Sequence, residues 1–104
     1  MEVGTGNVFQ DLDFADAGER KLRVQLAMRL NDLIDERKLT QIAVAEIFGI
    51  PQPHISELRN YKLKRFSSER LLHFITRLDQ DVEILIRPKA SNHLLGLVSV
   101  LVAA

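Results

Sequence analysis

A short segment near the middle of the chain carries side chains that can recognise the edges of nucleic-acid bases. The amide of Gln52 presents a donor beside an acceptor, which matches adenine, and the carboxylate of Glu57 can accept from the cytosine amino group. Ile55 and Leu58 recur at helical spacing among these polar residues, which predicts a short helix with one buried side. The predicted base-contacting residues on its outward side are Gln52, Pro53, His54, Ser56 and Glu57.

The residues just upstream predict the element that positions this helix. Thr40 is a suitable N-cap because its hydroxyl can accept a hydrogen bond from an orphan backbone N–H. Leu39, just before it, can pack against Val44, four residues inside the helix. Gly49 predicts the end of that helix, since glycine adopts a positive φ without steric cost. We therefore expect helices near 41–48 and 53–60, joined by a tight turn within a unit spanning 40–60.

Two prolines shape the turn between these helices. Pro53 disfavours helical backbone angles for the residue before it, Gln52. We therefore expect the second helix to begin at Pro53, where a missing N–H costs little, with Gln52 at the cap. Pro53 itself can offer a base only an apolar contact, for example to the methyl group of thymine.

This combination of residues resembles the Xre-type helix-turn-helix of lambdoid phage repressors. The resemblance rests on Leu39-Thr40-Gln41, Ala45, Gly49-Ile50, Gln52 and Ile55. The sequence departs from the family pattern at Pro51, which stands where a Ser or Thr cap is usual, and at Pro53, where a polar residue is usual. The resemblance implies a helical, lambda-repressor-like domain that binds DNA.

Flanking residues extend the resemblance to about residues 7–89 and look like those of small bacterial HigA-like antitoxins. They are Asn7-Val8-Phe9, Arg65-Phe66-Ser67, Arg70-Leu71-Leu72, Asp81-Val82-Glu83-Ile84 and Arg87-Pro88. This part of the resemblance implies that the protein neutralises a small basic toxin of the RelE/HigB type and represses the operon that the two share.

Charge is distributed unevenly along a chain whose net charge is zero. Residues 1–19 hold five acidic residues and no Lys or Arg, whereas residues 20–65 hold ten Lys or Arg against five acidic residues. The local sign of the charge matters more for DNA binding than the total, so the surplus supports a DNA-facing middle segment. The predicted phosphate-contacting residues are Thr40, Gln41, Arg59, Asn60, Lys62, Lys64 and Arg65.

Composition argues against several other classes of protein. The chain has no cysteine, which excludes disulfides and thiolate metal sites, and its three histidines show no metal-ligand spacing. No nucleophile–base pair or phosphate-cradling glycine loop is visible, so we expect no enzyme activity, cofactor or metal. The N-terminus lacks the pattern of a signal peptide. The longest apolar stretch, 94–104, is shorter than the roughly 20 residues that span a bilayer. We therefore expect a bacterial cytoplasmic protein, associated with the nucleoid when bound to DNA.

The expected fold is mainly α, in one small domain of 104 residues. A capping box of Asp16 and Glu19 predicts the start of a first helix that runs to about residue 38, and Ser67 is a suitable cap for a fourth helix. Residues 82–87 alternate as a strand does, which predicts pairing across a dimer through Val82, Ile84 and Ile86. The expected divisions are an acidic arm at 1–15, a helical domain at 16–80, a strand at 81–88 and an apolar tail of open role at 89–104.

We therefore predict a homodimeric repressor that places two recognition helices in successive major grooves, about 34 Å apart, on a pseudo-palindromic operator. The antitoxin role follows from the resemblance alone. The alternatives are a stand-alone or phage-like Xre regulator without a toxin, and a protein-interaction module whose helix-turn-helix is vestigial. Ile42 and Ile47 stand at positions that are usually polar in the family, and the sequence leaves open whether they meet the N-terminal arm, the C-terminal tail or a partner. The isoleucine surface or the acidic arm is a candidate to contact a basic partner protein; the alternative is that the isoleucines pack internally and the arm is a solubilising tail.

Overall fold

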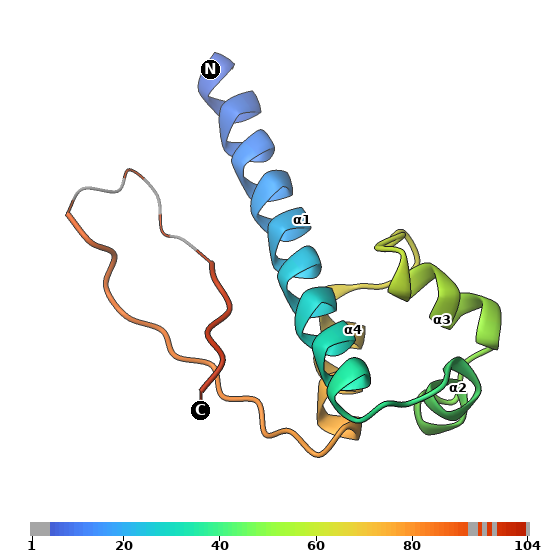
Figure 1. The fold of residues 1–104 in the computed structure, drawn as a ribbon. Coiled ribbons are helices and arrows are strands. Elements are labelled where there is room, and N and C mark those ends of the chain that lie inside the picture. Colours follow the sequence, from blue (N-terminus) through green and yellow to red (C-terminus); the bar gives the residue numbers. More distant parts are fainter. Residues whose placement is uncertain (1–4, 92–93, 95, 97, 104) are drawn as a thin grey trace.

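The computed structural model describes residues 5–91, 94, 96 and 98–103, with side chains from residue 17 onward in these ranges. These residues contain the helices α1 (Thr5–Glu36), α2 (Gln41–Phe48), α3 (Gln52–Arg59) and α4 (Ser68–Arg77). In Figure 1, α2 and α3 lie on one side of the C-terminal end of α1, and the chain after α4 lies on the other side. The prediction of a mainly helical fold is confirmed. None of the helices within the described ranges is long and apolar enough to cross a membrane.

One hydrophobic core holds the four helices together. It is centred on the second half of α1, which packs against α3 and α4, while α2 packs against α3 and α4. The rings of Phe48 on α2 and Phe74 on α4 are stacked, with their centroids 4.4 Å apart. Among the side chains of α1 that are described, from residue 17 onward, the buried ones all lie beyond residue 25. The core residues are Leu26, Ala27, Leu30, Leu33, Ile34, Val44, Phe48, Ile55, Leu58, Leu63, Phe66, Leu71, Phe74, Ile75 and Leu78.

The start of α1 differs from the prediction. α1 begins at Thr5, so the prediction that the first helix starts at Asp16, after an acidic arm at 1–15, is wrong about the start of the helix. No proline interrupts this stretch, so no residue there forces the helix to begin as late as Asp16. Glu19, expected in the capping box, instead accepts a hydrogen bond of 2.7 Å from the hydroxyl of Ser68. It thereby links α1 to the start of α4. The apolar side chains of the first helical turns lie outside the described side chains.

The caps of α2 and α4 are the predicted ones. The hydroxyl of Thr40 accepts from the backbone N–H of Ala43 at 3.1 Å, and that of Ser67 accepts from the N–H of Arg70 at 3.1 Å. Gly49 ends α2 with a φ of 70°, the left-handed conformation expected there. These local signals fix the position of α2 in the sequence.

Helix α3 begins one residue earlier than predicted. Pro51 occupies the N-cap position, and Gln52 is already helical. Pro53 therefore lies inside the first turn, where a backbone N–H has no helical partner to lose. A residue before proline prefers extended backbone angles, but here Gln52 adopts helical angles as the first residue of α3. Gln52 consequently projects from the first turn of α3 rather than from the preceding loop.

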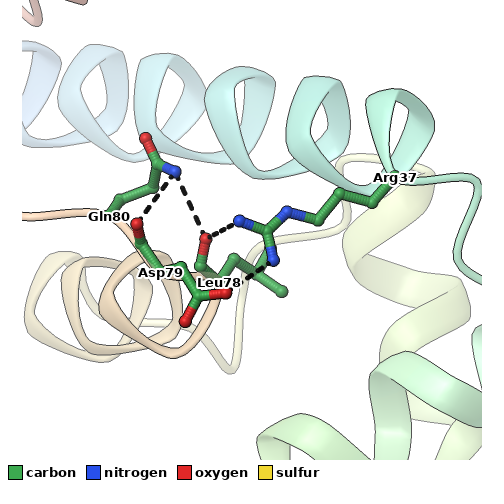
Figure 2. Close-up of polar contacts among 4 residues, drawn as sticks. All are labelled: Arg37, Leu78, Asp79 and Gln80. Atoms are coloured by element: carbon green, nitrogen blue, oxygen red, sulfur yellow. Dashed lines mark hydrogen bonds and ion pairs between the residues drawn. The ribbon is translucent and has the colours of Figure 1, made fainter.

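The chain leaves α4 at a fixed point. Arg37, just after α1, donates to the carbonyl oxygen of Leu78 at 2.6 Å and pairs with the carboxylate of Asp79 at 3.0 Å, as Figure 2 shows. The side-chain amide of Gln80 also donates to the Leu78 oxygen, at 3.2 Å. These contacts anchor the beginning of the C-terminal segment to α1 and to the end of α4.

No strand is present in the described residues 81–91. A strand is defined by hydrogen bonds to a neighbouring strand, and the described part of the chain supplies no such ladder partner for this segment. The predicted pairing needs a second copy of the chain, so the strand and the dimer through Val82, Ile84 and Ile86 stay predictions.

Candidate nucleic-acid interface

The N-terminal ends of α2 and α3 meet at a shallow surface hollow of about 190 Å³. Gln41, the first residue of α2, lines it together with Gln52, Pro53 and Ser56 of α3. Three of these residues are exposed, and Ser56 is half-buried. The fold thus brings two primary amides and a hydroxyl from separate helices to one surface. Groups of this kind can donate to and accept from the same base or phosphate.

The two sides of α3 divide as the sequence predicted. Ile55 and Leu58 are fully buried, and they fix the rotation of the helix about its axis. His54, Ser56 and Glu57 are half-buried and lie outside the core, and Gln52 and Pro53 are exposed. The predicted outward row therefore exists, although its members differ in how freely they can reach a ligand.

Glu57 is paired with Arg65 in the link that follows α3. The Nε of Arg65 donates to one carboxylate oxygen of Glu57 at 2.5 Å, and Nη2 donates to the other at 3.3 Å. The hydrogen bond from Arg65 lowers the pKa of Glu57, with smaller contributions from the nearby charges of Arg65, His54 and Lys62. The same bond raises the pKa of Arg65. A predicted base-contacting residue and a predicted phosphate-contacting residue thus neutralise each other in the free chain.

Arg59 points towards α1. Its Nη1 donates to the side-chain oxygen of Asn31 at 3.0 Å, and its Nη2 donates to Asp35 at 2.5 Å. Asn31 is only 6% exposed and also donates to the carbonyl oxygen of Leu58 at 3.3 Å. These contacts fasten the C-terminal end of α3 to α1. In the free chain they occupy the guanidinium that the sequence analysis assigned to phosphate.

Asn31 was missed by sequence reasoning, although a signal was present. It lies four residues after Ala27 and three before Ile34, both of which are buried, so helical spacing places it on the apolar face of α1. A buried amide must find hydrogen-bond partners. A polar residue in that row therefore indicates a buried contact with another element.

The basic link after α3, residues 61–66, contains two exposed lysines. Neither Lys62 nor Lys64 has a hydrogen-bond or ion-pair partner within the part of the chain that the structure describes. Asn60, in contrast, donates to the carbonyl oxygen of Ser56 at 2.8 Å and so caps the end of α3. Thr40 uses its hydroxyl as an N-cap. Among the predicted phosphate-contacting residues, the two lysines have the greatest freedom to meet a duplex backbone.

The two isoleucines of α2 have different environments. Ile42 is 61% exposed, whereas Ile47 is half-buried and packs against the core. The interpretation of Ile47 as an exposed contact residue is therefore wrong. Ile47 contacts the core of the domain, and the sequence of α2 alone does not reveal this contact.

A candidate metal site is not visible in the described residues. No three or more His, Asp or Glu residues within the described ranges are grouped so as to hold an ion. Of the three histidines considered from the sequence, His93 lies outside the described residues.

The comparisons with known proteins agree with this geometry. A family described as a helix-turn-helix domain matches residues 8–87. The chain belongs to the Xre family of helix-turn-helix transcriptional regulators. This rests also on a solved structure named "Putative XRE Family Transcriptional Regulator", which shares 49% sequence identity and has a TM-score of 0.80. That similarity covers 85% of this chain and 99% of the other. No curated protein matches the sequence. This Xre regulator is a DNA-binding protein, as the sequence predicted.

Proposed function

We propose that this Xre regulator represses transcription as a homodimer, with α3 of each subunit in one of two successive major grooves. The observation that carries the proposal is the hollow where Gln41, Gln52 and Ser56 meet on the exposed side of the helix-turn-helix. A short helix with exposed amides and a buried opposite side is the element that direct readout of the major groove requires. The protein acts by binding DNA and needs no catalytic group.

Within this proposal, the base contacts come first from Gln52 and Ser56, with His54 and Pro53 beside them. Gln52 is exposed in the first turn of α3, and the N-terminal residues of a recognition helix are those that contact base edges. Glu57 is less available for readout than Gln52, because both of its oxygens already accept from Arg65 in the free chain. Breaking the ion pair between Glu57 and Arg65 therefore costs free energy when DNA binds, and the carboxylate of Glu57 also offers a contact to a base.

The phosphate contacts come from Lys62, Lys64 and the N-terminus of α2. Backbone N–H groups at a helix N-terminus favour anions, and Gln41 begins that helix beside the proposed base contacts. Arg65 joins this set when it exchanges Glu57 for phosphate. We assign Arg59 a positioning role, since its guanidinium is held by Asn31 and Asp35 on α1.

The test is DNA binding over a range of salt concentrations. Replacement of both Lys62 and Lys64 by Ala should weaken binding to every sequence and reduce the slope of log affinity against log salt by roughly 1.8, since each phosphate contact contributes roughly 0.9. Removal of two charges far from α3, at Lys21 and Arg77, is the matched control. An unchanged affinity and slope in the double lysine variant would contradict the assignment.

The antitoxin role is a finer proposal about the same protein. It is supported by five acidic residues and no basic residue in the first nineteen, and by the 61% exposure of Ile42 on α2. Complementary charge speeds the encounter with a basic toxin, and an exposed apolar side chain prolongs the complex. Co-expression with the product of an adjacent gene tests it. Replacement of Ile42 by Ser should weaken a complex with a small basic neighbour, whereas absence of any such complex would remove the antitoxin role and leave a stand-alone regulator.

A further inference from the structure

The segment after α4 exposes apolar side chains from a fixed starting point. Ile84, Leu85 and Ile86 are 76%, 78% and 89% exposed, and every residue from 81 to 91 is exposed. The ion pair between Arg37 and Asp79 holds the chain two residues before this segment begins, as Figure 2 shows. Large neighbouring apolar side chains on a surface indicate an interaction site. The exposed apolar side chains therefore indicate a partner for this segment. The residues just before the segment are held beside the helices by Arg37.

The segment has two different sides when it is extended. Alternate residues of a strand point to opposite faces, so one face is apolar. The other face carries charges in a particular order, with acids before Leu85 and bases after it. The apolar face comprises Val82, Ile84, Ile86 and Pro88, and the charged face comprises Asp81, Glu83, Leu85, Arg87 and Lys89.

This charge order is complementary to itself in reverse. We propose that the segment pairs with the same segment of a second copy as a two-stranded antiparallel ribbon centred on Leu85. The inference rests on the proposed homodimer and specifies which residues meet in it. In this register Leu85 faces Leu85 of the other copy, Glu83 faces Arg87, and Asp81 faces Lys89. Each ion pair occurs twice because of the two-fold axis. Opposite charges directly across an antiparallel pair stabilise it.

Neighbouring registers lose part of this complementarity. A ribbon centred on Ile84 keeps Asp81 opposite Arg87 but places Glu83 opposite Leu85. A ribbon centred on Ile86 keeps Glu83 opposite Lys89 but places Leu85 opposite Arg87. These alternatives keep the same residues on the same two faces, yet within residues 81–89 each retains one type of ion pair instead of two. In the register centred on Ile84, Asp79 would also face Lys89, but Asp79 is already held by Arg37. The register centred on Leu85 also places Ile84 opposite Ile86 on the apolar face.

Pro88 fits the same register. Proline has no N–H to donate, so it is tolerated only where the N–H would point away from the partner strand. Pairs in an antiparallel ladder alternate between hydrogen-bonded and non-hydrogen-bonded positions. When Leu85 faces its copy in a hydrogen-bonded pair, Pro88 faces Val82 three positions away, in a non-hydrogen-bonded pair. The ribbon then forms without an unmet hydrogen bond at Pro88.

Charge reversal tests the proposal without relying on loss of binding alone. Glu83→Arg and Arg87→Glu each place like charges opposite one another twice, so each variant should dimerise about tenfold more weakly, or worse, in sedimentation. A mixture of the two variants restores opposite charges at both positions and should form heterodimers as tight as the wild-type dimer. Since misfolded variants would not recover on mixing, the recovery distinguishes pairing from damage. Unchanged dimerisation of the single variants, or no recovery in the mixture, would overturn the proposal.

Disulfide trapping tests the register, because the chain has no native cysteine. Leu85→Cys should cross-link with its own copy under mild oxidation. Ile84→Cys alone should not, since the two equivalent residues lie two positions out of step, beyond disulfide reach. A mixture of Ile84→Cys and Ile86→Cys chains should cross-link. Efficient cross-linking of Ile84→Cys alone, or none at Leu85→Cys, would overturn this register.

Binding of the reversal variants to a single operator half-site separates this inference from the proposed function. A monomeric Glu83→Arg chain should still bind a half-site and keep the salt dependence set by Lys62 and Lys64. If the reversal variants do not complement each other and the cysteine variants do not cross-link, while the wild-type protein still binds the operator, the ribbon is refuted and the repressor stays intact. If the reversal variants complement each other and Leu85→Cys cross-links, while the wild-type protein binds no DNA, the repressor is refuted and the ribbon stays intact.

Discussion

Glu57 is the residue of α3 whose charge state depends most on a single partner. Arg65 lowers its pKa below the ordinary value of 4.5. A carboxylate with a lowered pKa in the folded state stabilises that state above its ordinary pKa, and this contribution is lost as the pH falls through the folded value. The pair is exposed, so its contribution to stability is small. Its larger consequence is that acid or a competing anion favours the release of Arg65 from Glu57.

The first prediction concerns this pKa. Arg65→Met should raise the pKa of Glu57 towards its ordinary value, because it removes the hydrogen bond that lowers it most. A carbon-13 NMR titration of the Glu57 carboxyl group measures the change. Lys64→Met is the matched control and should leave the pKa of Glu57 where it is. An identical titration in Arg65→Met would show that Arg65 does not hold Glu57 in solution.

The second prediction concerns how this pair affects DNA binding. Glu57→Gln should tighten binding to DNA of any sequence, since it removes a negative charge from the DNA-facing side and frees Arg65. The slope of log affinity against log salt should increase by roughly 0.9, the contribution of one additional phosphate contact. Glu46→Gln, which removes an equal charge from α2, is the control. A slope that stays at the wild-type value would mean that Arg65 does not reach phosphate.

At the scale of the helices, the orientation of α3 depends on the buried contact with α1. Asn31→Ala removes the amide that bonds both Arg59 and the carbonyl oxygen of Leu58. Leaving buried polar groups without partners costs about 1–3 kcal/mol, and we expect a loss of unfolding free energy of that size in urea. Asp32→Ala, an exposed neighbour on α1, should change stability by less than about 0.5 kcal/mol. Equal stabilities of the two variants would contradict the buried contact.

Arg59 allows a sharper comparison of roles. If it positions α3, Arg59→Ala should lower the preference for operator over random DNA and destabilise the domain, while the salt slope stays the same. If it contacts phosphate, affinity should fall for every sequence and the slope should decrease by roughly 0.9. Titration of binding at several salt concentrations decides between the two, and we expect the first result.

The helices that local residues define are the ones that the sequence predicted. Thr40, Gly49 and Ser67 cap or end helices through contacts with near neighbours, so their signals are complete in the sequence. The start of α1 could not be predicted in this way, because no residue between Thr5 and Asp16 stops a helix. The direction of Arg59 depends on residues 24 and 28 positions away, at Asp35 and Asn31. Long-range contacts of that kind leave no local pattern beyond a polar residue in an apolar row.

At the scale of the whole molecule, a net charge of zero conceals segregated charge. The surplus of positive charge lies in the middle of the sequence, where α2, α3 and the basic link are found, and the acidic residues of the first nineteen offset it. A duplex responds to the local potential within roughly 8–10 Å at moderate salt rather than to the total. Binding should therefore be strongly salt-dependent despite the neutral balance. In a dimer that pairs through residues 81–89, the distance between the two α3 helices would depend on where Arg37 holds Asp79, because Asp79 lies just before each ribbon strand.

We propose that α3 reads DNA sequence through Gln52. Selection of preferred sites from random duplex DNA, carried out in parallel with the wild-type protein and with Gln52→Ala, tests it most directly. We expect a two-fold symmetric site for the wild-type protein, with preference lost in the variant at one base pair of each half-site. That loss is worth about 1–3 kcal/mol, and the salt slope should stay unchanged. Identical preferred sites for the two proteins, or no preferred site for the wild-type protein, would contradict it.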